Sequence, residues 1–428
     1  MLRLLGGLVL YVTTLYCGPR ARTGRGRRQE GGGLYPELAA FGFSEGSSPA
    51  LVSRVGRQCA LLPSYEIARQ ELAEQGTSLN IKVVHRLARQ LGAEVLTART
   101  RDLLRWRAGQ LPPEQTLAGK RVAAQIDGGR IRLRRVTRKQ KGRGKKKRQR
   151  RRYKAEWREP KLLILYEVDE RGRLKAGTKP WIDGTFGGPD EALELLAFHL
   201  HRLGAAAATV VTFVADGAPW IWDRLDWVQQ RVGLTAAQVR RVLDWCHALH
   251  HVSLALAALG LTEVERRRWY SKLRRWLRRG WPGLVIRELQ MGGAARGWPT
   301  ALTQPLGYLT KHLKAGHLAY GQFRRQGLPL GSGAVESAIR RVINLRLKGP
   351  GLMWLAENAE GALVLRAAAV TGRWDETLSW VREELGTDRQ LGWAWESPDM
   401  VAQLKAKVPI QPPVPQQASG QGDREEAA

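Results

Sequence analysis

A run of apolar residues that ends in a carboxylate sets the strongest limit on how this chain folds. Residues Val210–Ala215 are β-branched, aromatic or small, which is typical of a buried strand, and Asp216 follows at once. Gly217 and Pro219 then end the strand, and an amphipathic helix begins. A carboxylate at the end of a buried strand is a frequent metal-binding position in α/β cores. Taken alone, the pattern fits equally well an aspartate that only caps the next helix.

The overall charge indicates a polyanionic partner. The chain has 428 residues, a formal net charge of +31 and a pI of about 10.9. Such a balance is atypical of a metabolic enzyme and favours nucleic acid. An anionic membrane surface is the alternative, but we find no basic amphipathic anchor and no apolar stretch of about 20 residues. We therefore expect no membrane association.

The cysteines indicate a reducing compartment. Cys17, Cys59 and Cys246 lie far apart and form neither a CxxC zinc pattern nor a disulfide framework. This usage is typical of the cytoplasm.

Composition and periodicity divide the chain into six segments. Because 43% of the residues are apolar, most of the chain is expected to fold around at least one large core. The first residues read better as a strand, Leu8–Tyr16, than as a signal peptide. The expected segments are the N-terminal strand and a Gly/Arg-rich loop (1–50), a helix-turn-helix-like region and linker (51–118), the first part of an α/β core (119–251), an all-helical insertion (252–330), the end of the core with C-terminal helices (331–400) and a disordered tail (401–428).

The second segment reads as two helices joined by a short turn. Ser64–Gly76 is amphipathic, with Ser64 as its cap and Gly76 as its stop, and Ile81–Gly92 follows after four residues. The second helix carries basic side chains that would reach DNA if this is a helix-turn-helix. These are Lys82, Arg86 and Arg89. A plain helical hairpin fits the spacing equally well.

A second strand also ends in an acid. Arg121–Ile126 runs into Asp127, and the Asp127-Gly-Gly turn that follows is a hairpin signal leading to a strand at Ile131–Val136. A third strand is expected at Lys161–Val168 and a helix at Pro189–Leu203, before the strand that ends at Asp216. The order is therefore strand, strand, strand, helix, strand. On Asp-Gly statistics alone, Asp127 would be an ordinary turn residue.

A basic run interrupts this core. Arg138–Lys154 contains twelve Lys or Arg and no acid, so it cannot pack in a core. We expect a solvated hairpin loop, residues 137–159, in which Lys145, Lys146 and Lys147 contact phosphates. A localisation signal or simple solvation is the alternative.

A third acid lies far downstream, near the start of a helix. Ser332 is expected to cap the helix that continues to Lys348, and Glu336 lies off its apolar stripe. A surface pair with Arg340 would also explain Glu336. Three carboxylates from distant positions are what two-metal phosphoryl transfer requires, and Mg²⁺ prefers carboxylates together with water and phosphate oxygens.

Three strings of residues resemble a known family. They are Ile126-Asp127-Gly128, then Ala215-Asp216-Gly217-Ala218-Pro219-Trp220-Ile221-Trp222, then Gly331-Ser-Gly-Ala-Val-Glu336. Together with Arg341 and Gly349–Trp354, they resemble bacterial insertion-sequence DDE transposases of the ISKra type, from about Leu8 to Arg366. The resemblance implies a mixed α/β fold with an RNase H-like sheet and an all-helical insertion.

The resemblance also implies a reaction and its residues. Asp127, Asp216 and Glu336 would bind two Mg²⁺ ions, for which Mn²⁺ can substitute, to nick a transposon end and then join its 3′-OH to target DNA. The Asp244-Trp-Cys-His247 string matches a family signature, by which His247 would lie near the active site and contact DNA or order the acids. The alternative is that Asp244 only starts a helix and that the histidine packs against the protein. Arg340 and Arg341 would also contact DNA, and Trp220 or Trp222 would either stack on an unpaired base or pack in the core. The implied partners are double-stranded DNA and further copies of the chain, in the bacterial cytoplasm at the nucleoid.

Two other functions stay open at this stage. One is an RNase H-like nuclease with the same metal site. The other is a decayed or domesticated DNA-binding protein without activity, in which the three acids would not converge. Family members often carry more chain before the first strand, where a cysteine-containing zinc knuckle would lie. Here a single Cys17-Gly18 is present, so we do not expect a zinc knuckle.

Overall fold

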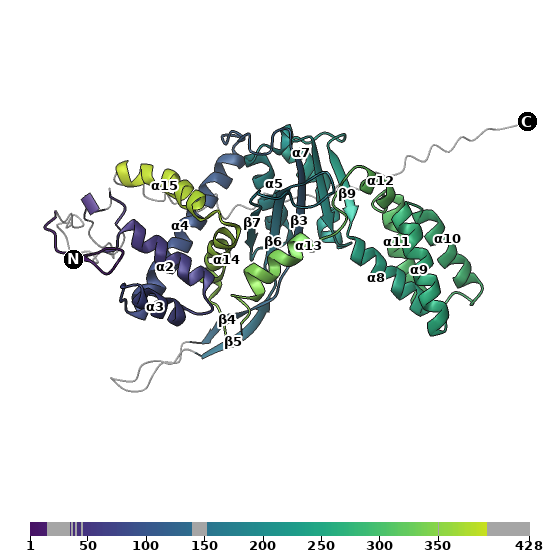
Figure 1. The fold of residues 1–428 in the computed structure, drawn as a ribbon, viewed down its shortest axis with the longest axis horizontal. Coiled ribbons are helices and arrows are strands. Elements are labelled where there is room, and N and C mark those ends of the chain that lie inside the picture. The colour runs from purple at the N-terminus through teal and green to yellow at the C-terminus, as the bar shows by residue number, and fades with distance from the viewer. Residues whose placement is uncertain are drawn as a thin grey trace, which may run out of the picture.

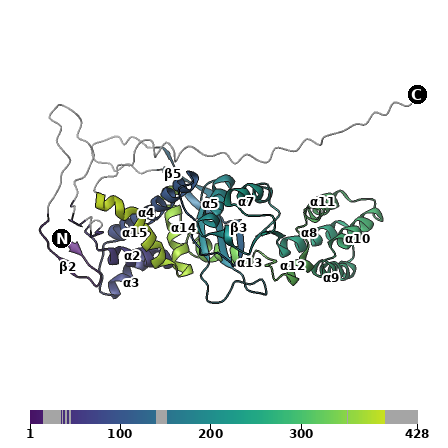
Figure 2. The ribbon, with the colours of Figure 1, turned by 90° about the horizontal axis from the view of Figure 1, so that it is seen from above.

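The computed structural model describes residues 1–14, 35, 37–38, 41–43, 46–138, 152–349 and 351–391. These form an elongated molecule with a β-sheet near its middle, N-terminal and C-terminal helices at one end and a helical unit at the other (Figure 1). The same order along the long axis is seen from above (Figure 2). Cys17, most of the basic run with Lys145, Lys146 and Lys147, and the tail from 392 lie outside the described residues.

The central sheet is mixed and has five strands in the order β7-β6-β3-β8-β9. Strand β3 pairs with β6 in antiparallel and with β8 in parallel orientation, β6 pairs antiparallel with β7, and β8 pairs parallel with β9. The strands are β3 (Arg121–Gly128), β6 (Lys161–Glu167), β7 (Trp181–Thr185), β8 (Val210–Ala215) and β9 (Val239–Leu243). The expected α/β class is confirmed at this level.

Helices cover both faces of the sheet. Successive side chains of β3 point to opposite faces and therefore pack against different helices. Val122, Ala124 and Ile126 pack in one core with helices α5 (Pro189–Arg202) and α7 (Leu225–Val232). Ala123, between them, belongs to the opposite core, which contains α13 (Gly333–Ile339) and α14 (Ala356–Thr371). Because side chains alternate along a strand, Gln125 and Asp127 lie on the face of α13.

The predicted hairpin after Asp127 is wrong. Strands β4 (Ile131–Arg138) and β5 (Arg152–Arg158) pair with each other as a separate two-stranded ribbon, and β6 takes the place beside β3. The chain leaves the sheet at Gly128–Gly129 and returns at Pro160, whose carbonyl accepts a 2.9 Å hydrogen bond from the Gly129 N–H. A Cβ on Gly129 would lie 2.5 Å from the Ile343 side chain, so the glycines permit a close crossing rather than a tight turn. Strand β7 was not predicted.

The N-terminal strand is also shorter than predicted. Of its described part, residues 8–14, only Val9–Leu10 (β2) is a strand, and it pairs with Leu2–Arg3 (β1) outside the central sheet. Gly6 and Gly7, at φ +83° and +80°, reverse the chain between the two strands.

Three N-terminal helices pack against the two C-terminal ones. They are α2 (Pro49–Leu61), α3 (Tyr65–Glu74) and α4 (Ile81–Arg107), and α4 packs on α14 and on α15 (Trp374–Leu391). Ser64 caps α3 as predicted. Helix α4, however, continues past Gly92, because this glycine lets its backbone approach that of Gly361 rather than ending the helix.

Five helices lie between β9 and α13 and form the unit at the far end of the molecule. They are α8 (Trp245–Ala258), α9 (Glu263–Arg279), α10 (Pro282–Ala294), α11 (Thr300–Lys314) and α12 (Tyr320–Arg325). Within the described part of the chain, no helix has the length and apolar character that a membrane crossing requires.

A buried charge network joins the N-terminal helices to the sheet. Arg99 of α4 forms ion pairs with Asp183 of β7, at 2.9 Å, and with Glu360 of α14. His199 Nε2 of α5 lies 2.8 Å from the other Asp183 oxygen. Burial alone would raise the pKa of Asp183, but the Arg99 charge and the hydrogen bonds from His199 and the Gly184 N–H outweigh it and lower the pKa to about 2.

We predict that Arg99→Met lowers the free energy of unfolding by about 3–5 kcal/mol, because it leaves two buried carboxylates without their cation. The measurement is urea unfolding followed by circular dichroism. A carboxyl with a lowered pKa stabilises the fold above its unfolded pKa of about 3.9 and loses this contribution as pH falls through about 2. The difference between the two proteins should therefore shrink below about pH 4.

The matched control is Arg267→Met, because Arg267 pairs with Glu263 on the exposed surface of α9. This variant should leave the urea midpoint unchanged. Equal effects of the two substitutions would contradict a structural role for the Arg99 network.

Candidate functional site

The pairing of β3 with β8 brings two aspartates to one edge of the sheet. In the parallel register Gln125 lies opposite Val214. Two residues further along each strand are Asp127 and Asp216, so the two carboxylates extend from neighbouring chains that lie about 4.8 Å apart. Both residues are half-buried. The Asp216 carboxylate accepts a 3.1 Å hydrogen bond from the Ala218 N–H, so it also caps the turn that follows.

A buried glutamine holds the helix of the third acid against the same strand. Gln125 Oε1 accepts a 3.0 Å hydrogen bond from the Val335 N–H, and Gln125 Nε2 donates to the Gly331 carbonyl at 3.0 Å. The Nε2 group also donates to Tyr166 Oη on β6 at 2.9 Å. Glu336 follows Val335 directly, so the first turn of α13 is fixed on the face of the sheet that carries Asp127.

A fourth acid joins three segments of the site. Asp244 is fully buried and begins α8. Its Oδ2 accepts from the His247 N–H and contacts His247 Nδ1, both at 2.8 Å, and its Oδ1 accepts from the Ser332 N–H at 2.6 Å. The Asp244 N–H donates to the Ala215 carbonyl at 2.8 Å. The helix-capping alternative for Asp244 is thus correct, and the same residue also orients His247.

The charges of these groups act on one another. The pKa of the Asp127 carboxyl is raised, first by burial and then by the negative charges of Asp216 and Glu336, against the Gly128 N–H and the His247 charge. The pKa of His247 is raised, first by its hydrogen bond to Asp244 and further by the charges of Asp244, Asp216 and Asp127. Asp127, Asp216, Glu336 and His247 therefore share one electrostatic environment.

The chain contains 70 Lys and Arg residues, but the described ones do not pair with the three acids. Within the described residues, neither Asp127, Asp216 nor Glu336 forms an ion pair with Lys or Arg. Each has one oxygen engaged by a neutral donor, from the Gly128 N–H, the Ala218 N–H and the Ser332 hydroxyl respectively. The second oxygen of each carboxylate has no donor in this part of the chain. Such a donor set suits Mg²⁺, which takes a few carboxylate oxygens and keeps water.

The carboxylates of Asp127, Asp216 and Glu336 do not converge on a common metal position. Among the residues that the structure describes, no three His, Cys, Asp or Glu side chains lie close enough to hold a metal ion. Glu336 is exposed and accepts a 2.8 Å hydrogen bond from Ser332 Oγ, instead of pairing with Arg340.

The two tryptophans lie in different environments. Trp222 is 7% exposed, stacks on His317 with ring centroids 4.2 Å apart, and donates to the Asp216 carbonyl. It has the packing role that the sequence allowed as the alternative to stacking on a base. Trp220 is half-buried beside the sheet edge, with Lys161 Nζ 4.5 Å from its ring.

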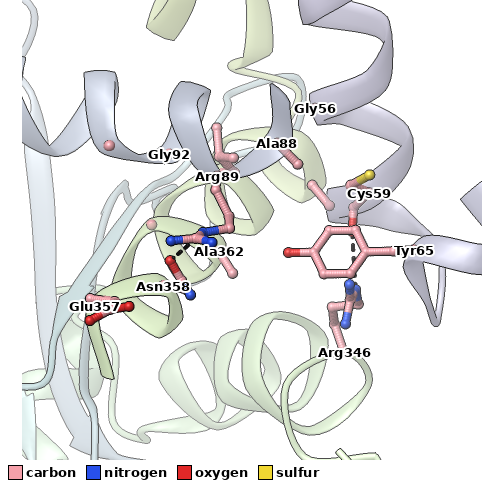
Figure 3. A pocket seen from close by; sticks show the side chains of 14 residues that line it. Gly56, Cys59, Tyr65, Ala88, Arg89, Gly92, Arg346, Glu357, Asn358 and Ala362 are labelled. Carbon is pink, nitrogen blue, oxygen red and sulfur yellow. Dashed lines mark hydrogen bonds between the residues drawn. The ribbon is translucent and has the colours of Figure 1, made fainter. Parts of the chain in front are cut away.

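The basic residues expected to contact DNA are mostly exposed. Lys82 and Arg86 lie on the solvent side of α4, and Arg340 is exposed after α13. Arg89 is partly engaged, because it donates to Asn358 Oδ1 of α14 at 2.8 Å (Figure 3). Arg341 is half-buried in the π-helical segment Arg340–Asn344.

A buried arginine, Arg346, fixes helices α2 and α3 to the chain that follows the site. Arg346 lies 5.3 Å from the centre of the Tyr65 ring and 5.1 Å from that of Trp354, and it donates to the Cys59 carbonyl at 3.1 Å (Figure 3). The Cys59 carbonyl belongs to the last turn of α2, where acceptors lack helical partners. The positions of α2 and α3 relative to the segment that follows α13 are thus held by direct contacts.

Sequence reasoning missed Gln125, and it assigned Asp244 only a cap or a family signature. A signal existed for Gln125, which is the one polar side chain in the otherwise apolar stretch Val122–Ile126 before Asp127. Tyr308 of α11 was also missed. A Cβ on Gly217 would lie only 2.2 Å from the Tyr308 hydroxyl oxygen. The helical unit therefore packs directly against the loop of Asp216.

Comparison with known proteins adds little. No protein-family model and no curated protein matches the chain. Among solved structures, the chain is similar to a chain of the Drosophila P element transposase strand transfer complex, with 9% sequence identity and a TM-score of 0.25 over 78% of this chain and 80% of that one. A likeness at this level says nothing about function.

We predict that Gln125→Leu raises amide hydrogen exchange at the start of α13, because the Val335 N–H and the Gly331 carbonyl lose their buried partner. The loss should lower the free energy of unfolding by about 1–3 kcal/mol. Mass spectrometry of peptides covering 331–339 measures the exchange. Gln322→Leu, at an exposed position on α12, should leave these peptides unaffected. Unchanged exchange in the Gln125 variant would show that the glutamine does not hold the helix.

We predict that Asp244→Asn lowers the pKa of His247, since the carboxylate that stabilises the imidazolium is removed. In the unmodified protein the raised pKa keeps His247 charged to higher pH, and the charge is lost as pH rises through that pKa. An NMR titration of the imidazole resonances measures the shift. Asp223→Asn, at an exposed position near the same edge, is the matched control and should not move it.

Proposed function

We propose that the chain is a DDE transposase of an insertion sequence, which binds transposon ends and catalyses metal-dependent DNA cleavage and strand transfer. The observation that carries the proposal is the placement of three acids on one face of the sheet, where none of them pairs with a Lys or Arg of the described residues. Asp127 and Asp216 end neighbouring parallel strands, and Gln125 clamps the helix of Glu336 beside them.

The topology supports an RNase H-like core. Counted along the chain, the sheet strands are β3, β6, β7, β8 and β9, so the spatial order is third, second, first, fourth, fifth. Three antiparallel neighbours are followed by a crossover through α5 to the parallel strand β8. The helical unit enters after β9, and Glu336 follows it, as the family resemblance implies.

The chain's own residues would bind and orient the DNA at this edge. Asp127, Asp216 and Glu336 would hold two Mg²⁺ ions, or Mn²⁺, which would supply activation of the attacking oxygen and stabilisation of the leaving one. His247, held by Asp244 and charged over a wider pH range than an ordinary histidine, would contact a phosphate oxygen. The net charge of +31 would bind the rest of the duplex, in part through Lys82, Arg86 and Arg340.

The proposed setting is the bacterial cytoplasm, with the protein bound to the nucleoid. Its partners would be double-stranded DNA, as transposon ends and target, and further copies of the chain, since cutting two ends requires two active sites. The helix-turn-helix role of α3 and α4 belongs to this proposal. It is supported by the exposure of Lys82 and Arg86.

The proposal is tested with DNA segments that flank the chain's own coding sequence, because transposon ends would lie there. We predict that the purified full chain with Mn²⁺ or Mg²⁺ cleaves these segments and joins them to a supercoiled plasmid. Asp216→Asn and Glu336→Gln should each lower cleavage by a factor on the order of 10³ or more while end binding stays unchanged. Gel analysis of labelled strands measures both steps.

The control is Glu357→Gln, an exposed glutamate on α14 away from the site, which should cleave normally. Cleavage without joining would favour the RNase H-like nuclease instead. Binding without cleavage, equal in all variants, would favour a non-catalytic DNA-binding protein. Full activity of Asp216→Asn would end the assignment of the site.

A further inference from the structure

The ribbon of β4 and β5 carries an exposed face of aromatic and arginine side chains. Arg132 lies opposite Trp157, and Arg134 lies opposite Ala155 in the antiparallel register, so these side chains share one face. Arg130 and Arg132 lie 5.5 and 5.7 Å from the centre of the Trp157 ring, and Arg134 lies 4.4 Å from that of Tyr153. Trp157 is 52% exposed and Tyr153 is 45% exposed.

The arginines of this face are not neutralised. Within the described residues, Arg130, Arg132 and Arg134 have no acidic partner, and each guanidinium lies over an aromatic ring. The neighbouring acids are engaged elsewhere, Glu156 with Arg158 and Glu159 with Lys161. Large rings left in water beside unpaired cations are atypical of a surface without a partner.

The opposite face fixes the ribbon beside the candidate site. Ile131 and Leu133 are buried in the core that contains α13. The Arg134 N–H donates to the Trp354 carbonyl at 2.7 Å, and the Trp354 N–H donates to the Arg132 carbonyl at 3.1 Å. The ribbon also starts only four residues after Asp127. Its exposed face therefore has a fixed position relative to the acids.

We propose that this face binds unpaired nucleotides next to the position where the DNA is cut. Bases stack on Trp157 and Tyr153, and the arginines exchange their ring contacts for phosphates. The inference rests on the proposed function, because DNA cleavage at the three acids would supply the place where a strand end is separated from its complement. Trp157 and Tyr153 are four residues apart on one strand, about 13 Å, so they engage different nucleotides.

The chemistry of the face favours unpaired rather than paired nucleotides. A duplex buries the faces of its bases in the stack and presents only their edges and the backbone. Aromatic rings bind base faces, which are accessible only in an unpaired strand, and a groove with cations beside the rings binds its phosphates. A ribbon that read a major groove would direct its arginines at base edges. Here Arg130, Arg132 and Arg134 lie over the two rings instead.

The test compares single-stranded and duplex DNA. Fluorescence anisotropy is measured with the full chain, a labelled 15-nucleotide single strand and a blunt hairpin duplex of the same sequence, in EDTA so that no strand is cut. We expect the double variant Tyr153→Ala, Trp157→Ala to lose roughly tenfold in single-strand affinity for each ring. Its duplex affinity should change by less than about twofold. Trp157→Phe should recover most of the single-strand affinity, since the ring is kept.

The matched control is Trp281→Ala. Trp281 lies in the helical unit, is 45% exposed and has Arg279 5.5 Å from its ring, so it offers the same chemistry at another place. The proposal is overturned if Trp281→Ala weakens single-strand binding as much as the double variant does. It is also overturned if the double variant weakens duplex binding equally, or if Trp157→Phe fails to recover binding.

Failure of this proposal can be separated from failure of the proposed function. Normal cleavage by the chain, with single-strand binding insensitive to Tyr153 and Trp157, would remove the ribbon site and leave the transposase assignment intact. Ring-dependent single-strand binding without any cleavage would support the ribbon site and remove the enzyme assignment. The salt dependence of binding adds a check, because Arg132→Gln should reduce its slope by about one phosphate contact.

Discussion

The candidate site depends on the hydrogen bonds of one buried amide. Gln125 of β3 accepts a hydrogen bond from the Val335 N–H and donates one to the Gly331 carbonyl. It thereby joins residues 210 positions apart in sequence. A buried amide whose donors and acceptors are satisfied fixes one arrangement, because each alternative leaves polar groups unpaired in a low dielectric. The helix of Glu336, α13, also packs its buried Val335, Ala338 and Ile339 against the sheet, and the amide adds the polar contacts that fix its first turn. The spacing of Gln125 and Asp127 by two residues then places the clamp and the acid on one face.

Asp244 extends this arrangement to the helical unit. Its carboxylate binds the Ser332 N–H and His247, and its own N–H binds the end of β8 at Ala215. Tyr308 adds a contact from α11 to Gly217, directly after Asp216. A displacement of the helical unit would therefore act on Asp216, His247 and the loop before Glu336 together. The unit is coupled to the acids by packing and hydrogen bonds, which a plain appended domain would lack.

The sequence predicted the local parts of this structure better than the long-range ones. The strands ending at Asp127 and Asp216 are present, because a buried strand and its terminating glycine are local patterns. The hairpin after Asp127 was wrong, since pairing partners are chosen by the whole sheet and Gly129 serves a close approach to Ile343 instead of a turn. Strand β7 was missed because five residues with a central Asp-Gly carry little strand signal. The buried Asp183 is stabilised in this strand by its ion pair with Arg99, which lies far away in the sequence. The role of Gln125 could not be predicted, because its partners lie on a helix that no local pattern connects to β3.

The arrangement of charge explains how such a basic chain can keep its acids available. A carboxylate within reach of Arg or Lys would form an ion pair and would compete with any cation from solution. Here the arginines that follow Asp127 most closely along the chain, Arg130, Arg132 and Arg134, lie over aromatic rings on the outer face of the ribbon. The rings stabilise the guanidinium groups without neutralising them, because a cation–π contact leaves the full charge in place. The same rings thus hold the cations away from the carboxylates and present them to a polyanion, so the separation of the two charges is built into the ribbon itself.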